Sequence, residues 1–154
     1  MSNPHVSYDD FRAQAPAAYA ALVSLSKSVH DAGFEDDLAE LIKVRASQIN
    51  GCAFCLQFHL TRARALGVAA TKLDLVAVWR DAGVFSEREC AALAWTEALS
   101  RLESEAAQDE AWAQMRKHFN EGHAVALTIA VATINAWNRI AGPLRFAPLV
   151  EARR

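Results

Sequence analysis

Two cysteines and a histidine stand close together in the sequence. Cys52 and Cys55 are three residues apart, and His59 follows Cys55 by four residues. If this stretch is a helix, with about 100° between successive residues, the three side chains share one face and Cys55 can touch His59. Both sulfur atoms then lie in or beside the first helical turn, where unpaired N–H groups and the helix dipole stabilise a thiolate. The pattern therefore predicts a reactive cysteine pair beside a base that can accept a thiol proton.

A glutamate on the preceding segment can complete this arrangement. Glu40 lies about three helical turns before Asn50-Gly51, which is a strong signal for a break between two helices. If the two helices pack side by side, Glu40 can approach His59 and hold its imidazole in the tautomer that a general base needs. A paired thiol with an adjacent base suits attack on a peroxide O–O bond, which gives a sulfenic acid. The second cysteine then condenses to a disulfide, and an external thiol reopens it.

Other interpretations of the same residues are open at this point. The two thiols can be buried and inert. Cys52, Cys55, His59 and Glu40 can also supply four zinc ligands, although two thiols three apart on a helix and one histidine make an incomplete site. A c-type haem attachment needs a histidine directly after the second cysteine, where this chain has Leu56. We therefore expect no metal and no cofactor.

The elements that must position these residues are expected to be helices. Of the 154 residues, 32 are alanine, 6 are glycine and 4 are proline, and alanine favours helices whereas glycine and proline break them. Apolar residues recur at helical spacing between the break signals. We therefore predict one all-α domain over residues 1–154, a bundle of about six to seven helices. The expected helices cover approximately residues 8–32, 35–50, 52–67, 70–81, 86–102, 108–119 and 121–140.

The last expected helix is apolar nearly all round, which is typical of a helix buried in the domain centre or in a subunit interface. Its polar residues Asn135, Asn138 and Arg139 are expected to satisfy buried backbone groups or to contact another subunit. Cys90 lies on an apolar helical face and is expected in the core. The four tryptophans are also expected there, because they fall at inward helical positions: Trp79, Trp95, Trp112 and Trp137.

Charge and composition exclude several classes of protein. The 16 basic and 18 acidic residues give a net charge of −2, without the basic excess of a general nucleic-acid binder. No run of 18 or more apolar residues is present, so we expect no membrane span. The first ten residues are polar and lack an apolar signal segment, which predicts a cytoplasmic protein. Three cysteines are too few for a disulfide scaffold.

The segment from Glu40 to His59 also resembles a known motif. The spacing of Glu40, Cys52, Cys55 and His59 is that of the core motif of the AhpD-like alkylhydroperoxidases, a family within the carboxymuconolactone decarboxylase superfamily. Three further segments, 79–80, 85–89 and 134–139, resemble the peroxidase-related branch, so the resemblance covers nearly the whole chain. The chain differs from the best-studied AhpD type at Phe54, where that type has a second histidine.

This resemblance implies an all-α fold, a homotrimer or homohexamer, and a proton relay. In the relay, Glu40 acts directly or through water on His59, which deprotonates Cys55. Cys55 is then the thiol that attacks the peroxide, and Cys52 is the resolving thiol. The implied partners are a peroxide substrate and an external thiol or dithiol reductant. The decarboxylase branch normally lacks this cysteine pair.

We therefore predict a thiol-dependent alkyl hydroperoxidase. Two alternatives use the same fold. One is a redox-sensing or binding protein, in which the disulfide changes the oligomer interface and turnover with any reductant is negligible. The other is a small-molecule enzyme of the carboxymuconolactone decarboxylase type, whose activity would survive the loss of both cysteines.

Overall fold

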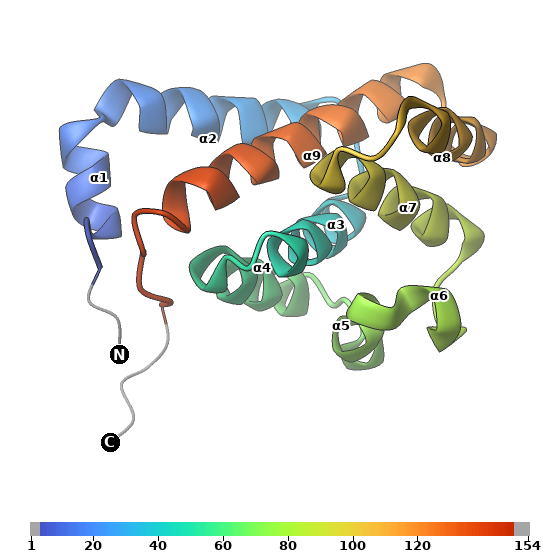
Figure 1. Cartoon of the computed structure of the whole chain (residues 1–154), viewed down its shortest axis with the longest axis horizontal. Coiled ribbons are helices and arrows are strands. Elements are labelled where there is room, and N and C mark those ends of the chain that lie inside the picture. The colour runs from blue at the N-terminus through green and yellow to red at the C-terminus, as the bar shows by residue number, and fades with distance from the viewer. Residues whose placement is uncertain (1–3, 150–154) are drawn as a thin grey trace.

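The computed structural model describes residues 4–149, and this part of the chain is an all-α bundle (Figure 1). Residues 1–3 and 150–154 of the predicted domain lie outside the described part. The elements are α1 (Tyr8–Gln14), α2 (Pro16–Asp31), α3 (Asp36–Ile49), α4 (Ala53–Ala65), α5 (Ala70–Leu75), the 3-10 turn η1 (Val76–Val78), α6 (Trp79–Ala82), α7 (Glu87–Arg101), α8 (Glu105–His118) and α9 (Glu121–Ala141). The predicted fold class is confirmed, but the nine α-helices within residues 4–149 exceed the predicted six to seven.

One reason for the higher number is a break near the N-terminus. The segment predicted over residues 8–32, with Pro16 as the start of its regular helix, is two helices, α1 and α2, and the second does begin at Pro16. Pro16 has no N–H to continue the helical hydrogen bonds, and Ala15 before it leaves the helical region, with φ −130° and ψ 55°. Proline fits instead the first turn of α2, where the N–H has no partner in any case.

The second reason is a change of winding in the segment predicted over residues 70–81. Leu73, Val76 and Trp79, three residues apart, are all buried. An α-helix would rotate such a series gradually off one face, whereas a 3-10 turn has three residues per turn and keeps them aligned. The segment accordingly divides into α5, η1 and α6. A third boundary was also wrong, because Ser104 caps α8 by accepting the N–H of Ala107, so this helix begins three residues before the predicted position 108.

The central helix of the bundle is α3. It packs against α4, α7 and α9, and nine of its side chains are buried. Leu41, Ile42 and Val44 are each at most 1% exposed, and burial of each stabilises the fold by about 1.5–3 kcal/mol. Glu40 and Arg45 are buried on the same helix although they carry charge, so each requires a partner inside the fold.

The longest helix, α9, crosses the bundle and packs against α2, α3 and α7 (Figure 1). Of the two locations predicted for it, the domain centre and a subunit interface, the first is confirmed, because its inward face runs from Ala124 to Ala141 with ten buried residues. Among the described helices it alone is long and apolar enough to cross a membrane, but 56% of its apolar window is buried inside the fold. That burial is typical of a core helix.

Candidate active site

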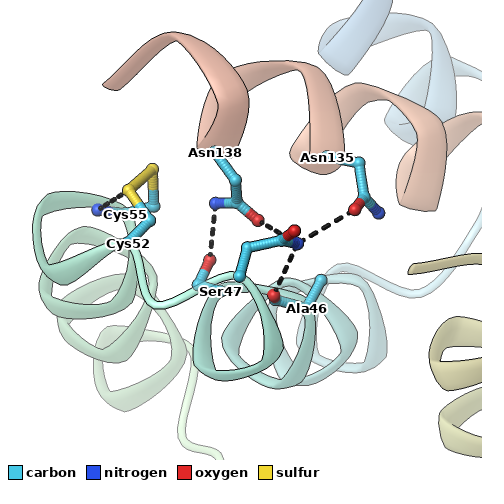
Figure 2. Close-up of a disulfide and its surroundings, with 7 residues drawn as sticks. Ala46, Ser47, Cys52, Cys55, Asn135 and Asn138 are labelled. Carbon is cyan, nitrogen blue, oxygen red and sulfur yellow. Dashed lines mark hydrogen bonds between the residues drawn. A yellow bond between two sulfur atoms is a disulfide. The ribbon is translucent and has the colours of Figure 1, made fainter. Parts of the chain in front are cut away.

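The cysteine pair follows a tight turn that is anchored to α9. Gly51 has φ +64°, in the left-handed region that glycine adopts without strain. The side-chain nitrogen of Asn50 donates to the carbonyl of Ala46 at 2.9 Å and to the side-chain oxygens of Asn135 at 2.9 Å and Asn138 at 3.0 Å (Figure 2). These bonds fix the end of α3, and therefore the start of α4, against α9.

The two asparagines of α9 are in turn satisfied within the chain. Asn138 Nδ2 donates to Ser47 Oγ at 3.1 Å (Figure 2), and Asn135 Nδ2 donates to Ser100 Oγ at 2.9 Å. The prediction that these residues satisfy buried backbone groups holds for Asn135, whose Nδ2 also donates to the carbonyl of Val131 at 2.9 Å, whereas the side-chain hydrogen bonds of Asn138 are to other side chains. Arg139, which was predicted with them, is exposed.

Cys52 and Cys55 form a disulfide, with their Cα atoms 5.4 Å apart (Figure 2). Cys52 is the N-cap of α4, and its sulfur accepts the backbone N–H of Cys55 at 3.2 Å. Both side chains are buried, with 2% and 3% exposed. An N–H donor at the positive end of a helix stabilises a thiolate, so the local structure favours the ionised form of Cys52 when the disulfide opens. Among residues 4–149 no group of three or more histidine, cysteine or acidic side chains is placed to hold a metal ion.

Glu40 and His59 are hydrogen-bonded across the contact between α3 and α4. His59 Nδ1 lies 2.6 Å from Glu40 Oε2, and the two side chains are 12% and 3% exposed. A carboxylate only accepts, so this partner assigns the imidazole proton to Nδ1. The neutral ring then keeps a lone pair on Nε2, which is the form a general base needs.

Lys43 is a third member of this group and was not predicted from the sequence. Its Nζ donates to Glu40 Oε1 at 2.8 Å, and its side chain is only 15% exposed. Arg62 Nε lies 3.4 Å from the same oxygen. The three-residue spacing of Glu40 and Lys43 on one helix was the available signal, because such residues are neighbours on the helix surface.

The charges of this group determine its protonation. Burial raises the pKa of Glu40, but the hydrogen bond and charge of His59, together with Lys43, outweigh burial and lower that pKa to about 2. Burial lowers the pKa of His59; the bond to Glu40 opposes this shift, and the charges of Lys43 and Arg62 add to it. Near neutral pH the pair is therefore a carboxylate and a neutral imidazole. Lys43 keeps Glu40 ionised when His59 carries no charge.

Glu40, His59 and Cys55 line one cavity of about 540 Å³. Cys52 is not among its lining residues, so Cys55 is the half of the disulfide that faces the cavity. Helices α1, α2, α3, α4 and α9 all contribute to the walls. The aromatic part of this lining was not predicted from the sequence; it consists of Tyr8, Tyr19, Phe54, Phe58 and Trp137.

The predictions for the tryptophans and for Cys90 hold in part. Trp79 and Trp95 are buried, at 8% and 7% exposure. Trp112 is 38% exposed, because it covers Trp95 from outside with the ring centres 5.5 Å apart. Trp137 is half-buried and belongs to the cavity wall. Cys90 is half-buried against the core, and burial raises the pKa of its thiol.

A buried ion-pair cluster supports α3 from the side of α6 and α7. Glu97 is 1% exposed and accepts hydrogen bonds from Arg45 at 2.7 Å, Trp79 at 3.1 Å and Arg101 at 3.1 Å. Arg80 donates to the same carboxylate. The four-residue spacing of Glu97 and Arg101 was a usable sequence signal. No spacing indicates Arg45, which is 52 residues away from Glu97.

Known proteins resemble the chain along most of its length. Residues 16–98, more than half of the chain, match the carboxymuconolactone decarboxylase family. The uncharacterised protein YdfG of Bacillus subtilis (strain 168) is 32% identical over 126 residues, which cover 82% of this chain and 86% of YdfG.

Two solved structures have the same fold. A protein of unknown function from Agrobacterium tumefaciens, suggested to be the antioxidant defence protein AhpD, matches with a TM-score of 0.89 and 36% identity, covering 97% of this chain and 100% of that one. The debrominase Bmp8 matches with a TM-score of 0.74 and 20% identity, covering 88% of this chain and 73% of that one, which shows a shared fold alone. From the family match and the 36% identical structure, the chain belongs to the carboxymuconolactone decarboxylase family and, within it, to the AhpD-like branch.

Proposed function

We propose that the protein reduces organic hydroperoxides through a dithiol–disulfide cycle of Cys52 and Cys55. The observation that carries this proposal is the 2.6 Å bond between Glu40 and His59 on the wall of the cavity that Cys55 faces. A nucleophile, a base and a group that orients the base thus converge on one small space.

In the first half of the cycle, Cys55 reacts with the peroxide. Neutral His59 takes the thiol proton on Nε2, and the resulting thiolate attacks the terminal oxygen of the O–O bond. The S–O bond forms and the O–O bond breaks. The departing alkoxide takes the proton back from His59 and leaves as an alcohol. Cys55 is then a sulfenic acid, two electrons more oxidised than the thiol.

In the second half, Cys52 resolves the sulfenic acid. Its sulfur attacks Sγ of Cys55, the S–S bond forms, the S–O bond breaks, and water leaves with the thiol proton of Cys52. The Cys55 N–H that Cys52 Sγ accepts at 3.2 Å favours the thiolate needed for this attack. The product corresponds to the disulfide of Figure 2.

An external dithiol, or two molecules of a thiol, then returns two electrons and two protons. The first thiolate attacks the sulfur of Cys55, which faces the cavity, and Cys52 leaves with its negative charge at the helix N-terminus. The second thiolate attacks the reductant's sulfur in this mixed disulfide, so that Cys55 leaves as a thiolate, the reductant becomes a disulfide, and its two thiol protons pass to the cysteines. We expect this cycle to operate in the cytoplasm, where thiol systems of this kind keep cysteines reduced.

The proposal includes assembly as a homotrimer or homohexamer. Val23 and Leu25 on α2 and Val125 on α9 are 43%, 42% and 50% exposed, and apolar side chains of this size are candidates for subunit contacts. Sedimentation of the purified protein tests this part; a monomer at all concentrations would contradict it.

The test of the cycle is a thiol count on the reduced protein before and after one equivalent of an organic hydroperoxide. We expect two of the three thiols to disappear and the intact mass to fall by two hydrogen atoms. In Cys52→Ser a sulfenic acid should be trapped on Cys55. Cys90→Ser, which keeps two thiols, is the matched control and should lose both, with the same fall in mass as the unmodified protein.

Two outcomes would contradict the proposal in different ways. If Cys55→Ser consumes the peroxide as fast as the unmodified protein, Cys55 is not the reacting thiol. If the disulfide forms once but no thiol or dithiol reductant sustains turnover, the pair acts as a redox sensor. We also expect His59→Asn to lower the rate of sulfenic acid formation by about 100-fold, as loss of a general base does.

A further inference from the structure

The cavity beside Cys55 has an apolar body and a charged edge. Its volume of about 540 Å³ is in the range of pockets that enclose small organic molecules. Aromatic rings from α1, α2, α4 and α9 form much of the wall, and Ala130 and Ile134 add aliphatic surface. Hydrogen peroxide would leave most of this apolar surface unused, whereas a ligand with a ring or an alkyl chain would cover it.

Most basic side chains of the cavity already have a carboxylate partner at close range. Three such pairs are present: Lys27 with Asp31 at 2.6 Å, His30 with Asp36 at 2.8 Å, and Lys43 with Glu40 at 2.8 Å. Their hydrogen-bonding capacity toward a ligand is correspondingly reduced.

Arg62 is the exception. Within residues 4–149 its only carboxylate contact is the 3.4 Å approach of Nε to Glu40, which is longer than a normal charged hydrogen bond. Glu40 does not depend on it, because His59 and Lys43 already donate to that carboxylate at 2.6 and 2.8 Å. The guanidinium lies 5.9 Å from the ring centre of Phe58, and the side chain is 58% exposed. Its outer nitrogens are thus free to bind a ligand at the edge of the aromatic wall.

The position of Arg62 on α4 also determines how far it lies from Cys55. Arg62 follows Cys55 by seven residues, which is two helical turns, so both side chains lie on the same face about 10 Å apart along the axis. A ligand that reaches both residues has its charged group and its reactive group separated by about that length. A benzene ring with a short chain on each side spans it.

We propose that the cavity selects organic hydroperoxides that carry a carboxylate, with the carboxylate paired to Arg62, the apolar body against the aromatic wall and the O–O bond at Cys55. The peroxide part of this statement rests on the proposed function. The recognition of an organic carboxylate does not, and it can be measured by itself.

The first experiment uses the oxidised protein, which has no free thiol at the site to react. Phenylhexanoate and its uncharged amide, phenylhexanamide, are titrated while tryptophan fluorescence is followed, since Trp137 lines the cavity. We expect the acid to bind about fivefold more tightly than the amide, as a partly exposed ion pair allows, and added salt to reduce the ratio.

The matched variants are Arg62→Gln and Arg64→Gln. Arg64 is an exposed arginine of the same helix that does not line the cavity. In Arg62→Gln the ratio of acid to amide affinity should fall to about one, and in Arg64→Gln it should stay at about five. Equal binding of acid and amide to the unmodified protein, or an unchanged ratio in Arg62→Gln, would overturn the proposal.

The second experiment separates this inference from the proposed function. The reduced protein is given a fatty-acid hydroperoxide or its methyl ester. Arg62→Gln should raise KM for the acid about fivefold, with a smaller change in kcat and little change in KM for the ester. If neither hydroperoxide is consumed, the proposed function fails, while the binding ratio of the first experiment still decides whether the cavity recognises carboxylates.

Discussion

Replacement of Glu40 by glutamine tests whether the buried carboxylate contributes stability in the way the site requires. Glu40 is 2% exposed, and its pKa is lowered from 4.5 to about 2. One pKa unit corresponds to 1.36 kcal/mol, so the ionised form gains about 3 kcal/mol from its surroundings on folding. Solvent screens little of this, because the side chain is enclosed by His59 and Lys43.

The lowered pKa of Glu40 determines how its contribution to stability changes with pH. A carboxyl whose pKa is lower in the folded state contributes stability that is fully present above its unfolded pKa and is lost as pH falls through the folded pKa. The contribution of Glu40 is therefore complete above about pH 4.5 and disappears toward about pH 2. His59 reduces the net effect, because without the carboxylate its own pKa falls further and the two groups titrate together.

We therefore expect Glu40→Gln to be about 2–3 kcal/mol less stable than the unmodified protein at about pH 7, and the gap to close toward about pH 2.5. The assay is urea denaturation of the oxidised proteins, followed by tryptophan fluorescence at several pH values. Glu110→Gln, at an exposed position of α8, is the control and should have the same free energy of unfolding as the unmodified protein at each pH. If the difference in free energy of unfolding between Glu40→Gln and the unmodified protein is the same at every pH, Glu40 does not stabilise the fold through its charge.

Three further predictions concern the supports of the site, each measured by urea or thermal denaturation. Gly51→Ala should destabilise the fold by about 1 kcal/mol, because its φ of +64° is unfavourable for alanine. An added Cβ would meet nothing within 4 Å, so this cost comes from the backbone alone. No loss of stability would show that the turn relaxes. Asn138→Ala should lower the free energy of unfolding by about 1–3 kcal/mol, because it leaves buried partners without their hydrogen bonds. Arg139→Ala, which changes the exposed residue next to it, should change that free energy by at most about 0.5 kcal/mol. Glu97→Gln should lower the free energy of unfolding by about 3–5 kcal/mol, because Arg45, at 9% exposure, is left without its counter-charge. A decrease of less than about 1 kcal/mol would contradict that account.

Local spacing was sufficient to predict that Cys55, His59 and Glu40 belong to one site. Cys55 and His59 are four residues apart, and the helical repeat places both on the cavity face of α4. Cys52 was predicted on the same face, but it is the N-cap before the first helical residue and does not line the cavity. The Asn50-Gly51 break predicted the turn, and the side-by-side packing of α3 and α4, which the prediction took as a condition, is present in the structure and brings Glu40 to His59. The 2.6 Å contact in the structure is what that reasoning anticipates.

Residues from distant parts of the chain could not be placed in this way. Tyr8, Tyr19 and Trp137 reach the cavity from α1, α2 and α9, and no periodicity within one helix indicates which distant helix it will meet. The partners of Asn50 are 85 and 88 residues away on α9. Their meeting depends on how whole helices cross, and a single sequence without related sequences carries no direct signal of that crossing.

Phe54 shows how the structure accommodates the departure from the best-studied AhpD type. The side chain is 6% exposed and packs against Tyr8 at 5.1 Å and Phe146 at 5.5 Å between ring centres, so it builds the cavity wall and cannot exchange protons. In the proposed cycle the resolving sulfur, that of Cys52, needs no histidine beside it, because the N–H that it accepts comes from the backbone of the helix N-terminus. His59 would then serve Cys55 alone. On this proposal the two buried sulfurs are activated by different means, that of Cys52 by the N-terminus of α4 and that of Cys55, which faces the cavity, by the Glu40–His59 pair.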